Sequence, residues 1–296
     1  MTAPDDSSRP LSAGSAPAPL FESKRVTPPG EYTKGIEGPA VDADGNLYVV
    51  NLGRAGTIGR LAPSATQSEL FAQLPGTSVG NGIRFDRDGR MYVADFVNHN
   101  VFVFERGATT PQVYFHSDTF HQPNDLAIAT DGTLFASDPL FRQRTGQIWR
   151  IARAAHGKGD GTIMSSPRQM GTTNGIDISP DGTTLYVGES ATHELWAYRI
   201  QGNDLVAPRR VAAFGSEIDG LRTDVDGRIF VTRPSAGVVT IVTPDGHTVR
   251  EVGLSAKIPS NLTFGGPDGC TVFVTQVEGR FIEAFRTDRP GREFGG

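Results

Sequence analysis

A repeated hairpin underlies this chain, and its clearest copy reads Thr173-Asn174-Gly175-Ile176-Asp177-Ile178-Ser179-Pro180-Asp181-Gly182-Thr183-Thr184-Leu185-Tyr186-Val187. Alternating apolar residues on both sides of an Asp-Gly pair are typical of two antiparallel strands joined by a tight turn. Five further turns of this kind occur, at Asp44-Gly45, Asp88-Gly89, Asp131-Gly132, Asp226-Gly227 and Asp268-Gly269. Successive turns are 42 to 50 residues apart, which is close to the period of a four-stranded propeller blade.

The second copy shows the four strands that this period implies. They are expected at Asn81–Asp86, Met91–Asp95, Asn100–Phe104 and Gln112–Phe115, where polar and apolar residues alternate between turn residues. The sequence shows no sustained helical period of 3.6 residues. It therefore predicts an all-β fold, a six-bladed β-propeller with four antiparallel strands in each blade.

The sixth copy ends after its third strand, at Phe285-Arg286, and needs a fourth strand from elsewhere. A strand at Leu20–Val26 has no sequential partner, so we expect it to complete this blade and close the ring, which protects strand edges. Residues 20–296 are thus predicted to form a single propeller domain. Residues 1–19 are rich in Ser, Pro and Ala and are predicted to be a disordered lead-in. The insertion Ala152–Ser166 in the third copy is expected to be an exposed loop between outer strands.

The composition excludes several classes of partner. The 296 residues carry a formal net charge of −5, which gives no positive footprint for nucleic acid. Cys270 is the only cysteine, so neither an intrachain disulfide nor a thiolate metal cluster is possible. The N-terminus does not resemble a signal peptide, and no stretch approaches the roughly 18 apolar residues of a membrane span. We therefore expect a cytoplasmic monomer or small homo-oligomer that acts on a small molecule and binds no nucleic acid or membrane.

One position of the repeat carries an oxygen-bearing side chain in every copy. Seven residues before each turn aspartate, the chain has Glu37, Asn81, Asn124, Asn174, Asp219 and Asn261. Because the innermost strand of each blade lines the central channel, these six residues are expected to meet at one height near the axis. Carboxylate and amide oxygens are hard donors that suit calcium, magnesium or manganese. We call this set the oxygen ring.

An alternative for single members of the oxygen ring is a turn-forming role, because Asn and Asp beside Gly are common in turns. A turn does not require Glu37, however, and two carboxylates that converge on one channel need a cation between them. Asp125, which follows Asn124, is expected to orient ligands from outside the ring.

The ends of the second strands form another set, which antiparallel pairing is expected to place near the same mouth of the channel. Its members are Asn51, Asp95, Asp138, Glu189, Arg233 and Gln276. Arg233 either orients a substrate or pairs with a neighbouring acid, and Asp138 is expected to support the site from behind. His121 precedes Asn124 and is either a substrate contact or a solvated loop residue.

Taken in order, several motifs resemble the regucalcin and gluconolactonase family of metal-dependent six-bladed propellers, over roughly residues 35–285. They are Glu37-Gly38-Pro39, Pro123-Asn124-Asp125, Phe135-Ala136-Ser137-Asp138-Pro139, Thr173-Asn174-Gly175, Ser179-Pro180-Asp181-Gly182, Asp219-Gly220-Leu221 and Phe264-Gly265-Gly266-Pro267-Asp268-Gly269. The resemblance implies that Glu37, Asn174 and Asp219 are metal ligands, that Asn124 binds metal or substrate, and that Asp219 is the general base. It also implies a divalent cation, with calcium first and zinc, manganese or magnesium as alternatives. Thr173 departs from the proline that many members have there.

These observations predict a metal-dependent hydrolase that opens a lactone ring, with a sugar lactone as the expected substrate. The cation would polarise the carbonyl, and Asp219 would take a proton from water or attack directly. Asn124, Asn81, Asn261, Arg233 and His121 would contact the substrate. Two alternatives remain open, a phosphotriesterase of the diisopropylfluorophosphatase type and a noncatalytic calcium-binding propeller.

Overall fold

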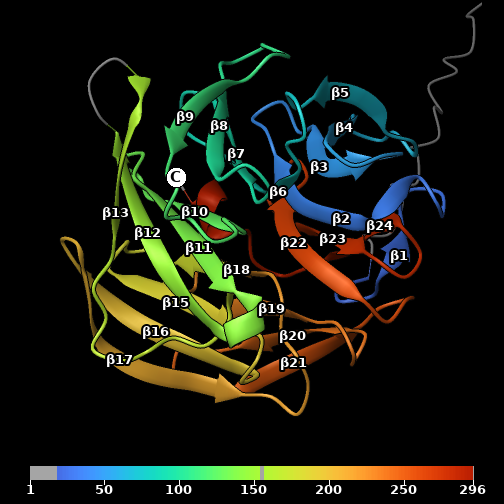
Figure 1. The fold of residues 1–296 in the computed structure, drawn as a ribbon. Helices are drawn as coiled ribbons and strands as arrows, with labels where there is room; N and C mark the ends of the chain where they lie inside the picture. Colours follow the sequence, from blue (N-terminus) through green and yellow to red (C-terminus); the bar gives the residue numbers. More distant parts are fainter. Residues whose placement is uncertain (1–18, 154–156, 296) are drawn as a thin grey trace, which may run out of the picture.

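A computed structural model describes residues 19–153 and 157–295, and it contains six four-stranded antiparallel sheets. Figure 1 shows the sheets arranged as blades around a central axis. Blades 1 to 5 each use four consecutive strands, from β2–β5 to β18–β21, whereas blade 6 has the order β1-β24-β23-β22. The predicted six-bladed propeller is therefore confirmed. The predicted disordered lead-in lies, apart from Pro19, outside the described residues.

The first three blades contain β2 (Tyr32–Val41), β3 (Leu47–Leu52), β4 (Thr57–Leu61), β5 (Glu69–Gln73), β6 (Gly80–Phe85), β7 (Met91–Asp95), β8 (Asn100–Phe104), β9 (Gln112–His116), β10 (Leu126–Ile128), β11 (Leu134–Leu140), β12 (Thr145–Arg153) and β13 (Gly159–Ile163). The other three contain β14 (Thr173–Ile178), β15 (Thr184–Glu189), β16 (Glu194–Gln201), β17 (Asp204–Ala213), β18 (Leu221–Thr223), β19 (Ile229–Arg233), β20 (Val238–Val242), β21 (Thr248–Gly253), β22 (Pro259–Gly265), β23 (Thr271–Gln276), β24 (Phe281–Arg286) and β1 (Lys24–Arg25). Among the described residues, short 3-10 helices occur at η1 (Phe141–Gln143) and η3 (Arg292–Phe294). Across the described part of the chain, no helix is long and apolar enough to cross a membrane.

The N-terminal segment closes the ring as predicted, although the strand it forms is shorter than Leu20–Val26. Only Lys24 and Arg25 pair in register with β24, opposite Ala284 and Glu283. Phe21 has a positive φ of 62°, which bends the chain before this strand. Its backbone nitrogen still donates a hydrogen bond of 2.7 Å to a carbonyl oxygen of β24. The first and last parts of the chain are thus joined within one sheet.

The prediction of an exposed loop over Ala152–Ser166 is wrong for most of that segment. The strands β12 and β13 pair there, with Ala152 opposite Asp160 and Arg153 opposite Gly159, and they form the outer part of blade 3. The glycine-rich sequence permits this because the backbone at Gly161 lies directly against the ring of Phe115 on β9, where a Cβ atom would clash. The insertion therefore extends a hairpin rather than forming a free loop.

Each predicted Asp-Gly turn needs its glycine for backbone reasons. All six turn glycines have positive φ angles, between 69° and 84°, in the region that L side chains rarely adopt. Where the inner strand ends in aspartate, its carboxylate accepts from the following turn. Asp86, for example, accepts backbone N–H bonds from Asp88 at 3.0 Å and Arg90 at 2.9 Å. The turns are therefore set by local chemistry that is readable from the sequence.

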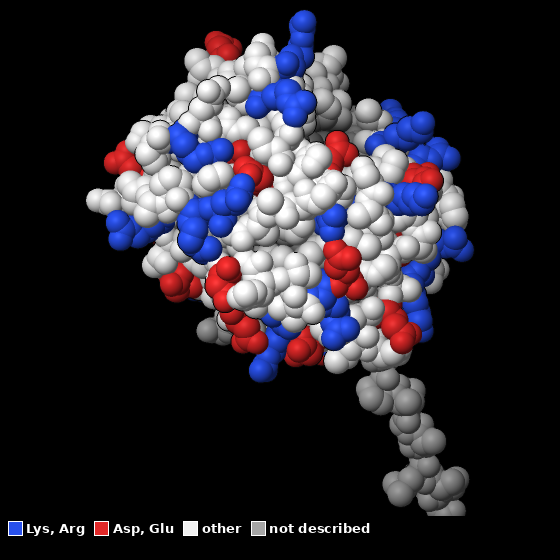
Figure 2. All heavy atoms as spheres, turned by 90° about the horizontal axis from the view of Figure 1, so that it is seen from below, with Lys and Arg blue, Asp and Glu red and all other residues white. Residues whose placement is uncertain are grey.

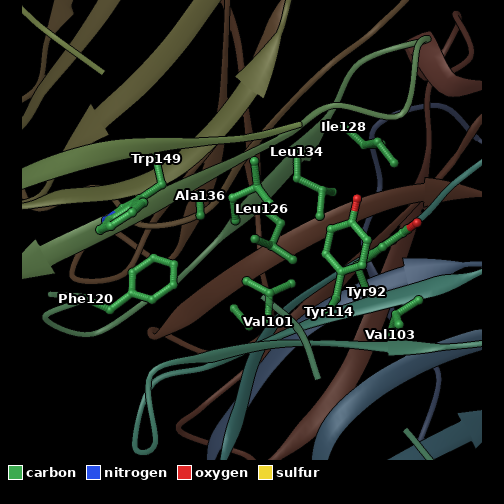
Figure 3. Close-up of a cluster of buried hydrophobic side chains, with 12 residues drawn as sticks. Tyr92, Val101, Val103, Tyr114, Phe120, Leu126, Ile128, Leu134, Ala136 and Trp149 are labelled. Carbon is green, nitrogen blue, oxygen red and sulfur yellow. The ribbon is translucent and has the colours of Figure 1, made fainter. Parts of the chain in front are cut away.

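The hydrophobic core lies between blades rather than in one central mass. One cluster fills the space between blades 2 and 3, and Figure 3 shows its aromatic members, among them Tyr92, Tyr114, Phe120 and Trp149. The Tyr92 and Tyr114 rings meet edge to face with centroids 4.9 Å apart, a favoured aromatic geometry. On the surface drawn in Figure 2, acidic and basic side chains are interspersed rather than gathered by sign.

Neighbouring inner strands touch near the axis because four members of the oxygen ring are followed by glycine. These glycines are Gly38, Gly82, Gly175 and Gly220. A Cβ atom on Gly175 would overlap the Asp219 carbonyl oxygen and lie 2.7 Å from the Leu221 nitrogen. A Cβ atom on Gly82 would lie 2.9 Å from the carbonyl oxygen of Asn124. Each glycine thus allows the strand of the next blade to approach.

We expect Gly175→Ala to lower the free energy of unfolding by about 1–3 kcal/mol, because the added methyl group pushes two inner strands apart. Gly253→Ala is the matched control, since a Cβ atom there meets no other atom within 4 Å, and its effect should stay within about 0.5 kcal/mol. Urea denaturation of both variants measures the difference. Equal stabilities would show that the close approach of the strands is not under steric control.

Candidate metal and active site

Breaks in strand pairing aim the oxygen ring at the axis. In blades 1, 2, 4 and 6, the register between the inner and second strands shifts at the ring residue, as between Thr173 and Ile176 in blade 4. The freed backbone groups bond to the next blade instead, where Gly175 N donates to the Asp219 carbonyl oxygen at 3.1 Å. Bulges of this kind commonly redirect side chains next to active sites. In blades 3 and 5, the ring residue precedes the inner strand altogether.

Two members of the ring are directly hydrogen-bonded to each other. The Asn261 amide Nδ2 donates to Glu37 Oε2 at 3.0 Å, and the Gly38 backbone nitrogen donates to the same oxygen at 2.9 Å. The amide oxygen of Asn261 accepts from Leu262 N at 2.9 Å. Asn261 is thus occupied at both ends of its amide and holds Glu37 in place.

Asn174 is held by its nitrogen alone. Its Nδ2 donates to Ser190 Oγ at 2.9 Å, and that hydroxyl donates to the Ile218 carbonyl at 2.7 Å. This contact orients the amide, so its oxygen stays available to another partner. Asn81 carries a related signal, because its Oδ1 is buried without a hydrogen-bond partner. A buried oxygen that lacks a partner is costly unless a ligand supplies one.

The two carboxylates of the ring have raised pKa values. Burial raises the pKa of Glu37 to about 7, the charge of Asp125 adds to this effect, and the hydrogen bonds from Gly38 and Asn261 oppose it. Burial also raises the pKa of Asp219 well above its usual range, with the charges of Glu37 and Asp125 adding to the effect. Asn174 acts in the opposite direction on Asp219. Like charges in a dry site create a demand for a cation.

The donor set fits a hard divalent cation. The ring offers two carboxylates and several amide oxygens, the chemistry that calcium prefers, and it contains an unpartnered oxygen at Asn81. In the described residues, no group of three or more His, Cys, Asp or Glu side chains is arranged to hold a metal ion. A site here therefore depends on the amides as well as on Glu37 and Asp219.

A cluster of charged side chains lies deeper in the channel and was missed by the sequence analysis. The Asp125 carboxylate is fully buried between two arginines, with Arg222 Nη1 at 2.9 Å and Arg84 Nη2 at 3.2 Å. Both guanidinium groups are also almost fully buried. Each arginine lies three residues after a member of the oxygen ring, within an otherwise apolar strand. This repeated position of a charged residue is the sequence pattern that could have predicted the cluster. Asp125 is neutralised by these arginines; an orienting role for it remains a prediction.

The residues at the ends of the second strands hold loops of their own blades. Asp138 accepts backbone hydrogen bonds from His121 and Gln122 and side-chain bonds from Gln147 and Trp149, all within 3.1 Å. It thereby fixes the segment that leads to Asn124. His121 remains about one-third exposed, with its Nδ1 buried 3.8 Å from Asp138.

The other members of this set have partners too. Arg233 lies against Glu251, at 2.6 Å, and donates to Ser216 at 3.0 Å, so the structure shows the pairing alternative for this residue. A substrate contact by Arg233 or His121 remains a prediction. The remaining four are buried and hydrogen-bonded within their own blades: Asn51, Asp95, Glu189 and Gln276.

The comparison with known families agrees with this geometry. A family model described as the SMP-30/Gluconolactonase/LRE-like region matches residues 36–278. This chain belongs to that family. The resemblance inferred from the motifs is therefore confirmed.

Individual members of the family differ in the names they carry. The gluconolactonase of Zymomonas mobilis is 24% identical over 277 residues, which cover 81% of this chain and 75% of that protein. The diisopropyl-fluorophosphatase of Loligo vulgaris is 25% identical over 303 residues, covering 93% and 94%. Regucalcin of Agrobacterium tumefaciens, described as a calcium-binding protein, shares the fold with a TM-score of 0.72 and 18% identity, covering 90% and 97%.

The raised pKa of Glu37 predicts how pH affects stability without a cation. Because the folded-state pKa is about 7 and the usual value is 4.5, stability is greatest below about pH 4.5 for this group and is lost as pH rises through 7. We expect the protein in EDTA to be less stable at pH 8 than at pH 5.5, by the order of 2 kcal/mol. Saturating calcium should remove this loss.

Glu37→Gln is the control for this prediction. The amide has a similar shape and cannot ionise, so the variant in EDTA should be more stable than the parent protein at pH 8 and should lose much of the pH dependence. Thermal unfolding across the pH range measures both. A parent protein whose stability in EDTA rises from pH 5.5 to 8 would contradict the assignment.

Proposed function

We propose that the protein is a divalent-cation-dependent lactonase that hydrolyses a sugar lactone at the oxygen ring. The observation that carries this proposal is the convergence of Glu37 and Asp219 with amide oxygens at one end of the channel, each carboxylate raising the demand for a cation. The membership of the family and the similarity to a gluconolactonase support the choice of substrate class.

Glu37, Asn174 and Asp219 would hold the cation, with Asn124 beside them. Asn261 keeps Glu37 in position, and Ser190 keeps the Asn174 oxygen free. When bound, the cation supplies a Lewis acid that stabilises negative charge developing on the carbonyl oxygen. Calcium is the first choice, because all the donors are oxygen atoms.

Asp219 would act as the general base. Next to a bound cation its carboxylate remains ionised near neutral pH, so it can accept a proton from the attacking water. The new bond joins the water oxygen to the carbonyl carbon, and the ring C–O bond breaks. The proton held by Asp219 can then pass to the departing ring oxygen, which yields a hydroxy acid. Asn81 and Asn124 would contact the substrate at the mouth.

We expect Asp219→Asn to lower kcat/KM for glucono- and galactono-lactones by about 10³-fold or more, because it removes both a ligand charge and the base. Asp245→Asn is the control, since this acid lies exposed in an outer turn, and it should retain full activity. Protein treated with EDTA should be inactive until calcium is restored. Hydrolysis is followed by the release of acid.

The same assay separates the alternatives. The similarity to a diisopropyl-fluorophosphatase over almost the whole of both chains favours a phosphotriesterase as the second candidate. Hydrolysis of a fluorophosphate with little turnover of any lactone would select it. Calcium binding without turnover of either substrate class would indicate a noncatalytic calcium-binding propeller and would overturn the lactonase proposal.

The charge balance of the channel predicts one divalent cation per chain. Asp125 is paired with both Arg84 and Arg222 and needs no further cation. Glu37 and Asp219 have no such arginine partner among the described ion pairs, and one divalent ion would balance their two negative charges. We expect calorimetry to give one calcium per chain, and Glu37→Gln to weaken binding by about 100-fold. Two calcium ions of similar affinity would show that this accounting is wrong.

A further inference from the structure

The C-terminal segment runs across the end of the channel that lies opposite the oxygen ring. It leaves β24 and follows the hairpin turns at the far ends of the inner strands of blades 5 and 6. Gly291 N donates to the Gly269 carbonyl at 3.1 Å, and Val225 N donates to the Pro290 carbonyl at 3.0 Å. Figure 1 shows the resulting short helix, η3, inside the ring near β10.

Arg292, at the start of η3, extends into the channel and contacts two further blades. Its Nε and Nη2 donate to Asp177 Oδ1 at 3.0 and 2.6 Å, and Nη2 also donates to the Ile128 carbonyl at 3.2 Å. The side chains of Arg292 and Asp177 are only 9% and 1% exposed. Through its backbone and this one side chain, the segment therefore ties blades 3, 4, 5 and 6 together.

Asp177 connects this contact to the candidate site. It lies on β14, three residues after Asn174, and its Oδ2 accepts from Thr223 N at 2.8 Å and Thr223 Oγ1 at 3.0 Å. Thr223 lies on β18, four residues after Asp219. The Asp177 carboxylate therefore links its own strand, which carries Asn174, to the strand that follows Asp219 and to the C-terminal segment.

The strand that follows Asp219 needs such support. β18 contains only three residues, and three pairs join it to β19. Asp219 and Gly220 precede it outside the regular pairing, and backbone bonds to Gly175, Thr232 and Ser260 hold them. Thr223 at the end of this short strand is fixed to β14 through its backbone nitrogen, which donates to Asp177, and through its hydroxyl, which lies between Asp177 and the Ile178 carbonyl. Removing Arg292 would leave the buried Asp177 charge without its cation, which strongly favours rearrangement.

We propose that Arg292 is a positioning residue for the oxygen ring, and that it acts through Asp177 on the strands that carry Asn174 and Asp219. The expected effect on cation affinity and turnover rests on the proposed function. The expected effect on the position of the two strands does not depend on that function. The C-terminal segment is thus a clamp on the site from the opposite end of the channel. An error of about 1 Å in a ligand or base is enough to lower activity by about 10²-fold.

The test compares Arg292→Ala with Arg289→Ala. Both changes remove one arginine from the same segment, but Arg289 is half-exposed and pairs only with the exposed Asp226 among the described ion pairs. Each variant is examined at a temperature where circular dichroism shows it to be fully folded. Calcium affinity is measured by calorimetry, and hydrogen exchange is measured in peptides that cover β14 and β18, without calcium.

Arg292→Ala should weaken calcium binding by about 10–100-fold, as loss of a supporting contact to a metal site usually does. It should also accelerate exchange in residues 173–178 and 219–223, whereas residues 47–61 of blade 1 should be unchanged. Arg289→Ala should stay within about twofold of the parent protein in both measurements. Arg292→Lys should recover part of the loss, and about 10 mM guanidinium should restore Arg292→Ala but not change Arg289→Ala.

The two measurements keep this proposal separate from the proposed function. If the parent protein binds no calcium and hydrolyses no lactone, but Arg292→Ala still accelerates exchange in β14 and β18, the function is wrong and the clamp stands. If the parent protein binds calcium and the folded Arg292→Ala variant binds it equally well, or if the variant exchanges like the parent in both strands, the clamp is overturned. Equal losses in Arg292→Ala and Arg289→Ala would also overturn it, because they would indicate a general effect of the segment.

Discussion

The convergence of buried negative charge on one axis is the constraint on which the centre of this molecule depends. Six inner strands meet there, and the charge of Asp125 raises the pKa of both Glu37 and Asp219, while Glu37 also raises that of Asp219. Buried carboxylates lose the solvation by water that stabilises their charge. The channel therefore needs positive charge beside Asp125 and beside the oxygen ring, and these two levels obtain it in different ways.

Two arginines supply the charge at the deeper level. Arg84 and Arg222 reach Asp125 from blades 2 and 5, so their ion pairs also connect the inner strands of three blades. At the level of the oxygen ring, the described side chains provide no such arginine, and the amides leave oxygen atoms available. The two levels thus have different roles. One is closed by protein groups, and the other is suited to a ligand that comes from outside.

Bringing the strands together and aiming the ring are two results of the same backbone feature. The bulges turn the ring residues toward the axis, and the following glycines let the next blade approach. The cost is a loss of regular pairing in the part of the blade that carries the chemistry. Contacts across blades replace it, including the bond from Ser190 to the Ile218 carbonyl and the bond from Thr223 on β18 to Asp177 on β14. A propeller built this way holds its site through its neighbours rather than through each blade alone.

Much of this could be read from the sequence because it depends on local chemistry with a regular period. The Asp-Gly turns, the alternation within strands and the missing strand of the sixth copy predicted six blades closed by the N-terminus. The repeat also placed Glu37, Asn174 and Asp219 at one position. The length of the closing strand and the hairpin at Ala152–Ser166 were not predicted, because each depends on what packs against it.

What the sequence by itself determined is therefore the number of blades, since the spacing of the repeat alone sets it. Only the tertiary structure decided which charges meet. Asp125 pairs with arginines 41 and 97 residues away, and Arg292 reaches Asp177 across 115 residues. No local pattern encodes such contacts, because they form only when separate blades close around one axis.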